Sequence, residues 1–315
     1  MKPWLMAAGL CAAQVLASTP ALAQQFTVVG ANVQKRANGV LALLGYQLTP
    51  DVTTGSLSIN DASAQNPGFQ QTSFGGGFTL SDKIPLYMEG TAGYARYDPK
   101  FVASDGQTQR SIPVKWNAVS ATGGVGWDFP LVPELVLRPI FNFSLGRVDS
   151  DGAVAQSIIE SRGGSPDLQF LSNGRLKARG LGGSLMLDYA HYRPEGEVDV
   201  ELRYTDIELA SFDSADAVSG RASAQSLSLW SRYRAPIGSL TLMDRPVRYV
   251  LEYAYTRFMG DLDGVLGFDH LHSIGFGLEA DTSKYDIFVS RARVVLRLKR
   301  GDNVSGYGVG LAVSF

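Results

Sequence analysis

Apolar and small residues alternate along the last twelve residues, 304–315. The odd positions from 307 onward are all apolar or aromatic: Tyr307, Val309, Leu311, Val313 and Phe315. The even positions from 306 to 314 carry only glycine, alanine or serine. Because successive side chains of a strand point to opposite faces, one face of this segment is apolar and the other is small. In a soluble protein such an edge would promote aggregation, whereas a closed barrel in a bilayer leaves no free edge. The pattern therefore predicts the last strand of a transmembrane β-barrel.

The same period-two alternation recurs from residue 50 onward and predicts an all-β, antiparallel barrel of twelve strands. The expected strands are 51–60, 69–80, 84–97, 112–129, 134–148, 175–190, 195–209, 221–235, 246–260, 266–281, 284–300 and 304–315. The strand at 284–300 changes phase, which predicts a bulge near Ser290. Closure of the ring requires the last strand to pair with the strand at 51–60.

The connections between these strands differ in length on the two sides of the barrel. The segments 81–83, 130–133, 193–196 and 281–283 are short and turn-like. The segments 98–111, 149–174 and 210–220 are long and polar, and 236–245 is an intermediate exception. Outer-membrane barrels have short turns on the periplasmic side and long loops outside. The C-terminus is therefore expected at the periplasmic rim, which agrees with the even number of strands.

On several strands, charged residues fall on the face that lies opposite the apolar face. A lipid-facing Arg at mid-membrane costs roughly 2–4 kcal/mol, so these charges are expected in the lumen, where opposite charges can pair. The charges expected to define this lumen are Arg138, Glu201, Arg203, Arg248, Glu252, Arg293, Arg297 and Lys299.

The segment before the first strand has a different pattern. Val33, Val40, Leu41, Leu44 and Leu48 recur at roughly helical spacing, which favours a helix over 31–48 that ends before Pro50. The alternative is that 40–48 forms a strand, because short apolar runs do not distinguish the two.

Residues 1–23 read as a secretory signal. Lys2 is the basic start, an apolar run follows, and Ala21-Leu-Ala23 is a small-x-small cleavage site before Gln24. Cys11, the only cysteine, lies inside this signal, so no disulfide framework is expected. The expected organisation is a signal peptide at 1–23, a linker or plug helix at 24–49, and a barrel at 50–315.

Charge and hydropathy exclude two other classes of protein. Without the signal the chain has 27 basic and 30 acidic residues, which gives no support to nucleic-acid binding. Mean hydropathy is close to zero, and no segment after the signal has 18 uncharged apolar residues in a row, which excludes a helical membrane protein. Neither observation excludes a barrel, whose spans average to neutral hydropathy.

Few residues could carry chemistry. His270 and His272 share one face of a strand with Phe268, Ile274 and Phe276, and they are interpreted as interfacial residues on the lipid side near the outer rim. His191 is expected at a turn, among headgroups or water.

An outer-membrane hydrolase would need a nucleophile and a base within hydrogen-bond reach. Ser273 or Ser290 could lie near the histidines, but no motif links them. No enzyme activity, metal or cofactor is expected.

Several stretches resemble the β-domain of autotransporters, specifically solitary barrels without a large passenger. They are Phe74-Gly-Gly-Gly-Phe-Thr-Leu80, Leu86-Tyr-Met-Glu-Gly-Thr-Ala-Gly-Tyr-Ala-Arg-Tyr97, Gly124-Val-Gly-Trp-Asp-Phe129 and the terminal strand. The resemblance covers about residues 50–315. It implies a twelve-stranded barrel in the cell outer membrane, with a helix threaded through its pore before the first strand. It also implies that Phe315, with Tyr307, Leu311 and Val313, is the signal read by the barrel-assembly machinery, and that periplasmic chaperones are partners.

Two departures from that family narrow the expected function. About 26 residues separate the cleavage site from the first strand, too few for a secreted passenger, and residues 24–60 contain no Asn-Asn pair at which some family members cut themselves. The sequence therefore favours a plugged barrel with a structural, translocator-like or surface-interaction role. The alternatives are a narrow diffusion pore for small solutes and, less favoured, a hydrolase. The surface ligand is not specified by the sequence.

Overall fold

The computed structural model describes residues 27–28, 41, 44–46, 54–59, 68–98, 100–163, 174–212, 220–242, 245–264, 268–281, 291–302 and 305–314. The strands are β1 (Thr27–Val28), β2 (Thr54–Ile59), β3 (Gly68–Ser81), β4 (Ile84–Asp98), β5 (Lys100–Ser104), β6 (Gln109–Pro113), β7 (Lys115–Trp127), β8 (Phe129–Val132), β9 (Leu135–Asp151), β10 (Arg175–Tyr192), β11 (Glu197–Phe212), β12 (Arg221–Leu242), β13 (Arg245–Gly260), β14 (His270–Asp281), β15 (Arg291–Arg300) and β16 (Ser305–Ser314). The helix α2 (Ala153–Arg162) lies between β9 and β10.

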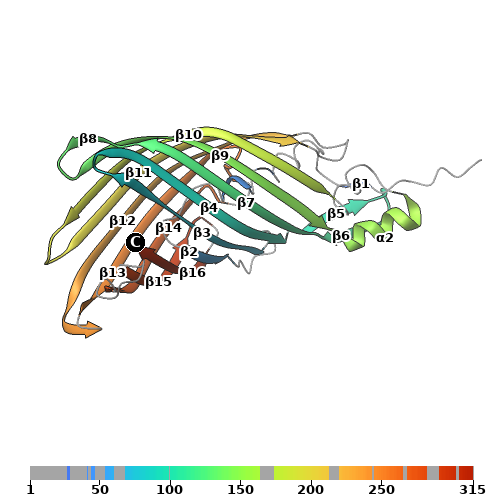
Figure 1. The fold of residues 1–315 in the computed structure, drawn as a ribbon. Helices are drawn as coiled ribbons and strands as arrows, with labels where there is room; N and C mark the ends of the chain where they lie inside the picture. The colour runs from blue at the N-terminus through green and yellow to red at the C-terminus, as the bar shows by residue number, and fades with distance from the viewer. Residues whose placement is uncertain are drawn as a thin grey trace, which may run out of the picture.

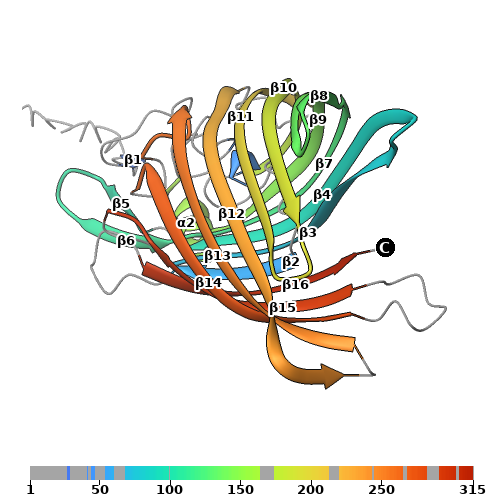
Figure 2. The same ribbon diagram turned by 90° about the vertical axis from the view of Figure 1, so that its left-hand side faces the viewer.

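Twelve of these strands pair in an antiparallel ring. Going round it, β2 is followed by β3, β4, β7, β9, β10 and then β11 to β16 in order. The ring closes where β16 pairs with β2, in the register Gly306↔Ile59 to Leu311↔Thr54. Figures 1 and 2 show the strands running obliquely along the wall of the barrel. The twelve-stranded antiparallel barrel predicted from the alternation is confirmed, including its closing pair.

One end of the barrel carries more structure than the sequence predicted. The segment 98–111, expected to be a loop, contains β5 and β6, which pair with each other, and β1 pairs with β5. The loop expected at 149–174 contains α2. Figure 1 shows α2, β1, β5 and β6 gathered at this end. The strand predicted at 112–129 is interrupted at Val114, where the sheet of β5 and β6 meets the barrel strand β7.

At the other end the connections are tight. β12 continues to Leu242 and β13 begins at Arg245, with a register shift between Pro236 and Thr241, so the expected connection at 236–245 is the tip of a long hairpin. The expected turn at 130–133 overlaps β8, which pairs back on β9. Glu134, after β8, is the one non-glycine residue with positive φ that the structure describes. The difference in connection length between the two ends follows the predicted asymmetry.

Some sequence predictions concern residues that lie outside the described part of the chain. They are the signal peptide at 1–23, most of the segment 24–49, the start of the strand predicted at 284–300 with its bulge near Ser290, the side chain of Val313, and Phe315. β15 is described from Arg291 and β14 from His270, later than the starts predicted for these strands. Of the predicted helix at 31–48, four residues are described: Leu41, Leu44 and Gly45 are helical, and Tyr46 is in a turn.

Among the described residues, no helix is long and apolar enough to cross a membrane.

Candidate functional site: an occluded lumen in two layers

Inward-facing side chains fill the lumen in two layers of different chemistry. Nearer the tight turns is the ionic layer, in which eight carboxylates face eight guanidinium groups among the described residues. Its members are Glu89, Asp128, Asp188, Glu197, Asp199, Glu201, Glu252 and Glu279 with Arg138, Arg203, Arg232, Arg234, Arg248, Arg291, Arg293 and Arg297. Nearer α2 is the apolar layer, which is built from aliphatic and aromatic side chains.

The centre of the ionic layer is a bidentate pair between β4 and β11. Arg203 donates from Nη1 to Oε2 of Glu89 at 2.8 Å and from Nη2 to Oε1 at 2.7 Å. Asn142 Nδ2 donates to Glu89 Oε1 at 2.7 Å, and Arg203 also donates to Ser184 Oγ and Thr205 Oγ1. The exposed fractions of the two charged side chains are 0% for Glu89 and 5% for Arg203. Two fully desolvated charges across the lumen are tolerated because each satisfies the other and the polar neighbours bind the remaining lone pairs.

A second group of charges links β11, β12, β13, β14 and β15. Arg234 contacts Glu197 at 2.8 Å, Glu279 at 3.0 Å and Asp199 at 3.2 Å. The other arginines of the group bind the same three carboxylates, with Arg232 at Asp199, Arg248 and Arg291 at Glu197, and Arg293 at Glu279. Each carboxylate therefore serves at least two guanidinium groups, and the five strands are connected by one network.

Two further clusters complete the ionic layer. Arg138 binds Asp128 and reaches Asp188 at 3.0 Å, and its guanidinium lies over the ring of Tyr87 at 4.0 Å from the centroid. On the opposite wall, Arg297 of β15 binds Glu252 of β13 at 2.7 Å.

The structure places the predicted lumen charges as follows. Arg138, Arg203, Glu252, Arg293 and Arg297 are buried inside the barrel, and Arg248 and Glu201 face inward with partial exposure. Glu201 is the cross-strand neighbour of Asp188. Lys299 is on the inward face of β15, opposite Gly306.

The apolar layer surrounds the described part of the N-terminal segment. Leu41 and Leu44 have exposed fractions of 0% and 1% and belong to one buried cluster with side chains from most of the barrel wall. The other members are Ala95, Ile112, Val114, Trp116, Ala118, Val148, Ile158, Leu176, Ala178, Ile207, Leu209, Ala222, Ala224, Phe258, Leu262 and Phe268. Ile158 belongs to α2, so this helix also contributes to the layer. Full burial of a Leu side chain stabilises a structure by roughly 1.5–3 kcal/mol, so two such residues give a strong reason for the segment to stay inside.

Tyr46 fixes the end of this segment to the connection between β13 and β14. Its hydroxyl donates to the carbonyl of Leu262 at 2.5 Å, and its ring contacts Phe258 and Phe268 with centroid separations of 4.6 and 5.9 Å. Gly146 on β9 has no side chain, and a Cβ there would collide with Leu44. Polar and apolar contacts thus both hold the segment within the ring of strands.

The outer surface of the barrel changes polarity at the same height as the lumen. Beside the ionic layer the outward side chains are apolar and exposed, such as Phe141 and Phe143 on β9 and Leu185 on β10. Beside the apolar layer the outward positions are polar, such as Asn117, Arg147 and Arg179. The part of the barrel near α2 therefore has the polar exterior and apolar interior of a water-soluble protein, and the remainder has the reverse.

Terminal strand β16 has the orientation that its alternation predicted. Tyr307, Val309 and Leu311 are exposed on the outer face, whereas Gly308, Gly310 and Ala312 are buried on the inner face. Gly310 lies against the guanidinium of Arg297, and a Cβ at this position would collide with it. The small residues of the strand thus make room for the ionic layer.

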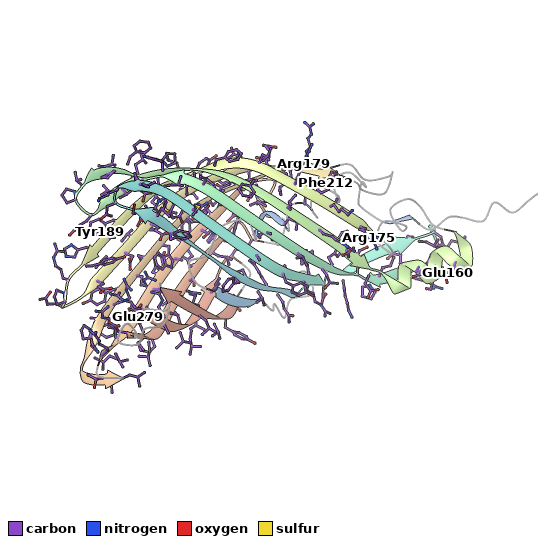
Figure 3. The ribbon with its side chains drawn as sticks, in the orientation of Figure 1. Glu160, Arg175, Arg179, Tyr189, Phe212 and Glu279 are labelled. Atoms are coloured by element: carbon purple, nitrogen blue, oxygen red, sulfur yellow. The ribbon has the colours of Figure 1, made fainter. Side chains whose placement is uncertain are left out.

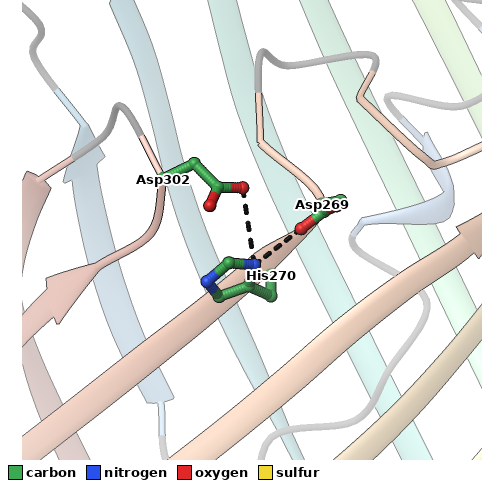
Figure 4. A group of neighbouring side chains, drawn as sticks. All are labelled: Asp269, His270 and Asp302. Atoms are coloured by element: carbon green, nitrogen blue, oxygen red, sulfur yellow. Dashed lines mark hydrogen bonds and ion pairs between the residues drawn. The ribbon is translucent and has the colours of Figure 1, made fainter.

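A separate cluster of titratable residues, outside the two layers, lies at the rim on the α2 side of the barrel. It forms where the connection before β14 meets the connection after β15. His270 Nδ1 is 2.6 Å from Oδ1 of Asp269 and 3.4 Å from Oδ2 of Asp302 (Figure 4). The three ligand atoms lie within 4.8 Å of one another, close enough to hold a cation, although Arg257 already binds Asp269 at 2.7 Å.

The pKa of Asp269 lies below its usual range, chiefly because of its hydrogen bond with His270. The contribution of this carboxylate to stability is therefore present above about pH 4 and is lost as the pH falls through the lowered value.

The histidines do not form the constellation of a hydrolase with Ser273. Ser273 is buried on the inner face of β14, whereas His272 is exposed on the outer face, with its Nδ1 3.0 Å from the hydroxyl of Tyr253. Ser290 lies outside the described residues. The prediction that Phe268 shares the lipid-facing side was wrong, because Phe268 precedes β14 and its ring is buried in the apolar layer. His191 is half-buried at a turn, where it contacts Glu134 at 2.7 Å.

The apolar layer was not predicted, although the sequence holds a signal for it. Along β11 the apolar side chains occupy even positions from Val198 to Tyr204 and odd positions at Ile207 and Leu209. The inward face is therefore polar up to Thr205 and apolar beyond it. The same inversion occurs on β7, β9, β10 and β12.

Comparison with known proteins gives structural matches only. No protein-family model matches the chain, and no curated protein matches it in sequence. The transport unit of the autotransporter AIDA-I from Escherichia coli is similar in structure, with a TM-score of 0.50 and 12% identity over 89% of this chain and 99% of that one.

Two further autotransporter domains match less closely. For the β-domain of the Bordetella autotransporter BrkA the TM-score is 0.47 and the identity 14%, over 84% of this chain and 97% of that one. For the translocator domain of NalP from Neisseria meningitidis the values are 0.43 and 12%, over 84% and 87%. At 12% identity the likeness to the AIDA-I transport unit concerns the fold alone, that of an antiparallel β-barrel.

Proposed function

We propose that this protein is a plugged outer-membrane barrel, which presents α2 and the β5–β6 hairpin at the cell surface and does not act as a diffusion pore. The observation that carries the proposal is the burial of Leu41 and Leu44 in one apolar cluster with the surrounding barrel strands. An apolar layer of this kind gives a hydrated solute no polar partner along its path, and desolvation of an ion there is costly.

The ionic layer supports the same proposal. A diffusion pore needs charged side chains that are free to interact with the solute, whereas the inward guanidinium groups of Arg203, Arg234 and Arg297 already bind carboxylates. The ionic layer therefore offers a solute few free charged groups, and the apolar layer is the barrier that closes the barrel. The surface role follows from the length and structure of the connections at the α2 end.

The orientation can be tested by labelling intact cells. Glu160 is an exposed residue of α2, and the only cysteine of the chain is Cys11 in the expected signal peptide. A Glu160→Cys variant is expected to react with a membrane-impermeant thiol reagent added to whole cells. A matched Glu195→Cys variant, in the exposed turn between β10 and β11, is expected to react only after the outer membrane is permeabilised. The opposite labelling pattern would contradict the proposed orientation.

The closed state can be tested by ion conductance in a planar bilayer. The intact protein is expected to give no steady current, whereas a Leu41→Asp, Leu44→Asp variant, which places two carboxylates in the apolar layer, is expected to conduct. A steady conductance of the intact protein would contradict the closed state. It would favour the alternative considered from the sequence, a narrow diffusion pore for small solutes.

The hydrolase alternative has a separate test. The double variant His270→Ala, His272→Ala is expected to match the wild type in lipid and peptide hydrolysis assays. A hydrolytic activity that depends on these histidines would contradict the proposal that the protein is not an enzyme.

Assembly by the barrel-assembly machinery, assisted by periplasmic chaperones, stays a prediction from the terminal strand. Phe315→Ala is expected to lower the amount of barrel that reaches the membrane more than the stability of barrel already inserted. Normal insertion of this variant would leave β16 with a closing role alone.

A further inference from the structure

Four basic side chains lie together on the outer wall of β9 and β10, and we define Arg147, Arg175, Lys177 and Arg179 as the basic strip. Arg147 and Lys177 are direct cross-strand neighbours, and Arg179 is the neighbour of Leu145. Arg147, Arg175 and Arg179 are exposed. Figure 3 shows Arg175 and Arg179 at the end of the barrel that carries Glu160, away from Tyr189 and Glu279.

The acidic residue that binds this strip is Asp149 on β9, among the ion pairs of the described residues. Asp149 binds Arg147 at 2.8 Å and Arg175 at 3.2 Å, so one carboxylate serves two guanidinium groups. A guanidinium has five N–H donors, so most of those on these two arginines remain unused by Asp149. Arg179 has no ion pair or hydrogen bond with any other residue in the described part of the chain.

Two acidic residues lie on the outer face of the next strand, β11. Asp206 accepts a hydrogen bond from Gln225 at 3.1 Å, and Glu208 is the cross-strand neighbour of Leu181. The four basic side chains of the strip outnumber Asp149 and these two carboxylates, so a net positive charge remains.

The strip begins where the apolar belt of the barrel ends. Leu145 and Leu181, with exposed fractions of 61% and 57%, are the outward residues next to Arg147 and Arg179 on the side of the apolar belt. Ten residues separate Tyr189 from Arg179 along β10. At about 3.4 Å per residue and a tilt of about 40°, that span is roughly 25 Å along the barrel axis, which matches the height of the apolar band of an outer-membrane barrel. Arg179 is thus placed at the level of the lipid headgroups.

We infer that the basic strip binds the phosphate groups of the phosphorylated glycolipid in the outer leaflet. Guanidinium groups match phosphate oxygens in charge and geometry, and the exposed Leu145, Leu181 and Phe143 directly beneath would contact the acyl chains of the same molecule. A soluble anion would contact only the basic side chains, whereas a lipid would contact the basic side chains and the apolar ones beneath them. This inference rests on the outer-membrane location and orientation in the proposed function.

The test measures binding of a bis-phosphorylated glucosamine-disaccharide lipid to the purified, full-length barrel by native mass spectrometry. Binding is compared for the wild type, the variant Arg175→Gln, Lys177→Gln, Arg179→Gln and the single variant Arg179→Glu. The matched control is Arg221→Gln, Arg257→Gln, Arg300→Gln, which removes three basic side chains from β12, β13 and β15 at the same end of the barrel.

We expect the strip variant to bind the lipid at least about tenfold more weakly, because three charge-assisted contacts are lost, and the control to bind like the wild type. Arg179→Glu is expected to weaken binding by itself, and the dephosphorylated lipid should bind weakly to every form. Equal losses in the strip variant and the control, or equal binding of the dephosphorylated lipid, would overturn the inference. Displacement of the lipid by millimolar inorganic phosphate would also overturn it, in favour of a site for small anions.

Labelling of Glu160→Cys on intact cells distinguishes failure of the lipid site from failure of the proposed orientation. Surface labelling together with unchanged lipid binding by the strip variant would remove the lipid site and leave the location intact. Failure of Glu160→Cys to label would instead remove the location on which the inference rests.

Discussion

The two layers of the lumen fill the same barrel by opposite means. In the ionic layer, charges such as Glu89 and Arg203 are held in place by specific partners, and removal of either partner leaves the other buried and uncompensated. In the apolar layer, Leu41 and Leu44 are held by contacts with many side chains, none of which is essential alone. The stability of the ionic layer therefore depends on the pairing of charges, and that of the apolar layer depends on how fully the side chains occupy the space.

The difference is explained by what surrounds each layer. Where the wall faces lipid, its outward residues must be apolar, so polar residues gather inside and pair. Where the wall extends beyond the lipid, the exterior can be charged, as at Arg147 and Arg179, and the interior packs like a soluble core. One strand such as β11 meets both conditions by shifting its alternation once.

The largest expected effect is the loss of one partner in the ionic layer. Glu89→Leu leaves Arg203 buried without its carboxylate and is expected to destabilise the barrel by about 3–5 kcal/mol. Addition of Arg203→Met should restore most of the loss, because both charges are then absent. Urea unfolding in detergent micelles, followed by heat-modifiable migration on a gel, measures the difference. A single variant as stable as the wild type would contradict dependence on pairing.

Truncation in the apolar layer should cost somewhat less and should have no partner that rescues it. Leu44→Ala removes a fully buried side chain and is expected to weaken retention of the N-terminal segment by about 2–4 kcal/mol, whereas Leu44→Met, which conserves volume, should cost less than about 1.5 kcal/mol. The readout is the open probability in a planar bilayer. Equal behaviour of the Ala and Met variants would show that volume does not control this layer.

The inversion of the outer surface can be tested on a single strand. Phe143→Arg places a charge in the apolar belt and is expected to cost about 2 kcal/mol or more, whereas Arg147→Leu, four residues further along β9, should change stability by less than about 1 kcal/mol. Both changes in stability are measured by unfolding the barrel after its reconstitution in lipid vesicles. Similar costs at the two positions would mean that the edge of the belt is not between them.

The smallest effect is expected at the rim cluster. Asp302→Asn removes the more distant of the two carboxylates at His270, and the melting temperature should stay within experimental error, because exposed ion pairs contribute little. A clear loss of thermal stability would show that the rim connections depend on this cluster, and a rise in melting temperature on addition of Zn²⁺ would show that it holds a metal.

Most of the barrel could be predicted from the sequence because lipid imposes strict alternation on each strand. The positions of Arg138, Arg203 and Arg297 inside, and the pairing of β16 with β2, follow from that rule alone. Partners across the lumen, such as Glu89 with Arg203, could not be predicted, because they depend on barrel width and side-chain length. The helix α2 was missed because residues 153–162 have no clear apolar stripe.

The N-terminal segment shows a further limit of sequence reasoning. Its helical spacing indicated a helix, and Leu41, Leu44 and Gly45 are helical, but no pattern told which wall residues would receive it. The receiving surface includes Gly146, whose missing side chain makes room for Leu44, and Tyr46 bonds to a loop carbonyl more than two hundred residues away.

The central claim, that the apolar layer closes the barrel around the N-terminal segment, is tested most directly by single-channel recording of the intact protein beside its Leu41→Asp, Leu44→Asp variant. The account predicts no steady conductance for the intact protein and a measurable conductance for the variant, since two carboxylates cannot remain in a dry cluster. A steady open conductance of the intact protein, unchanged in the variant, would contradict it.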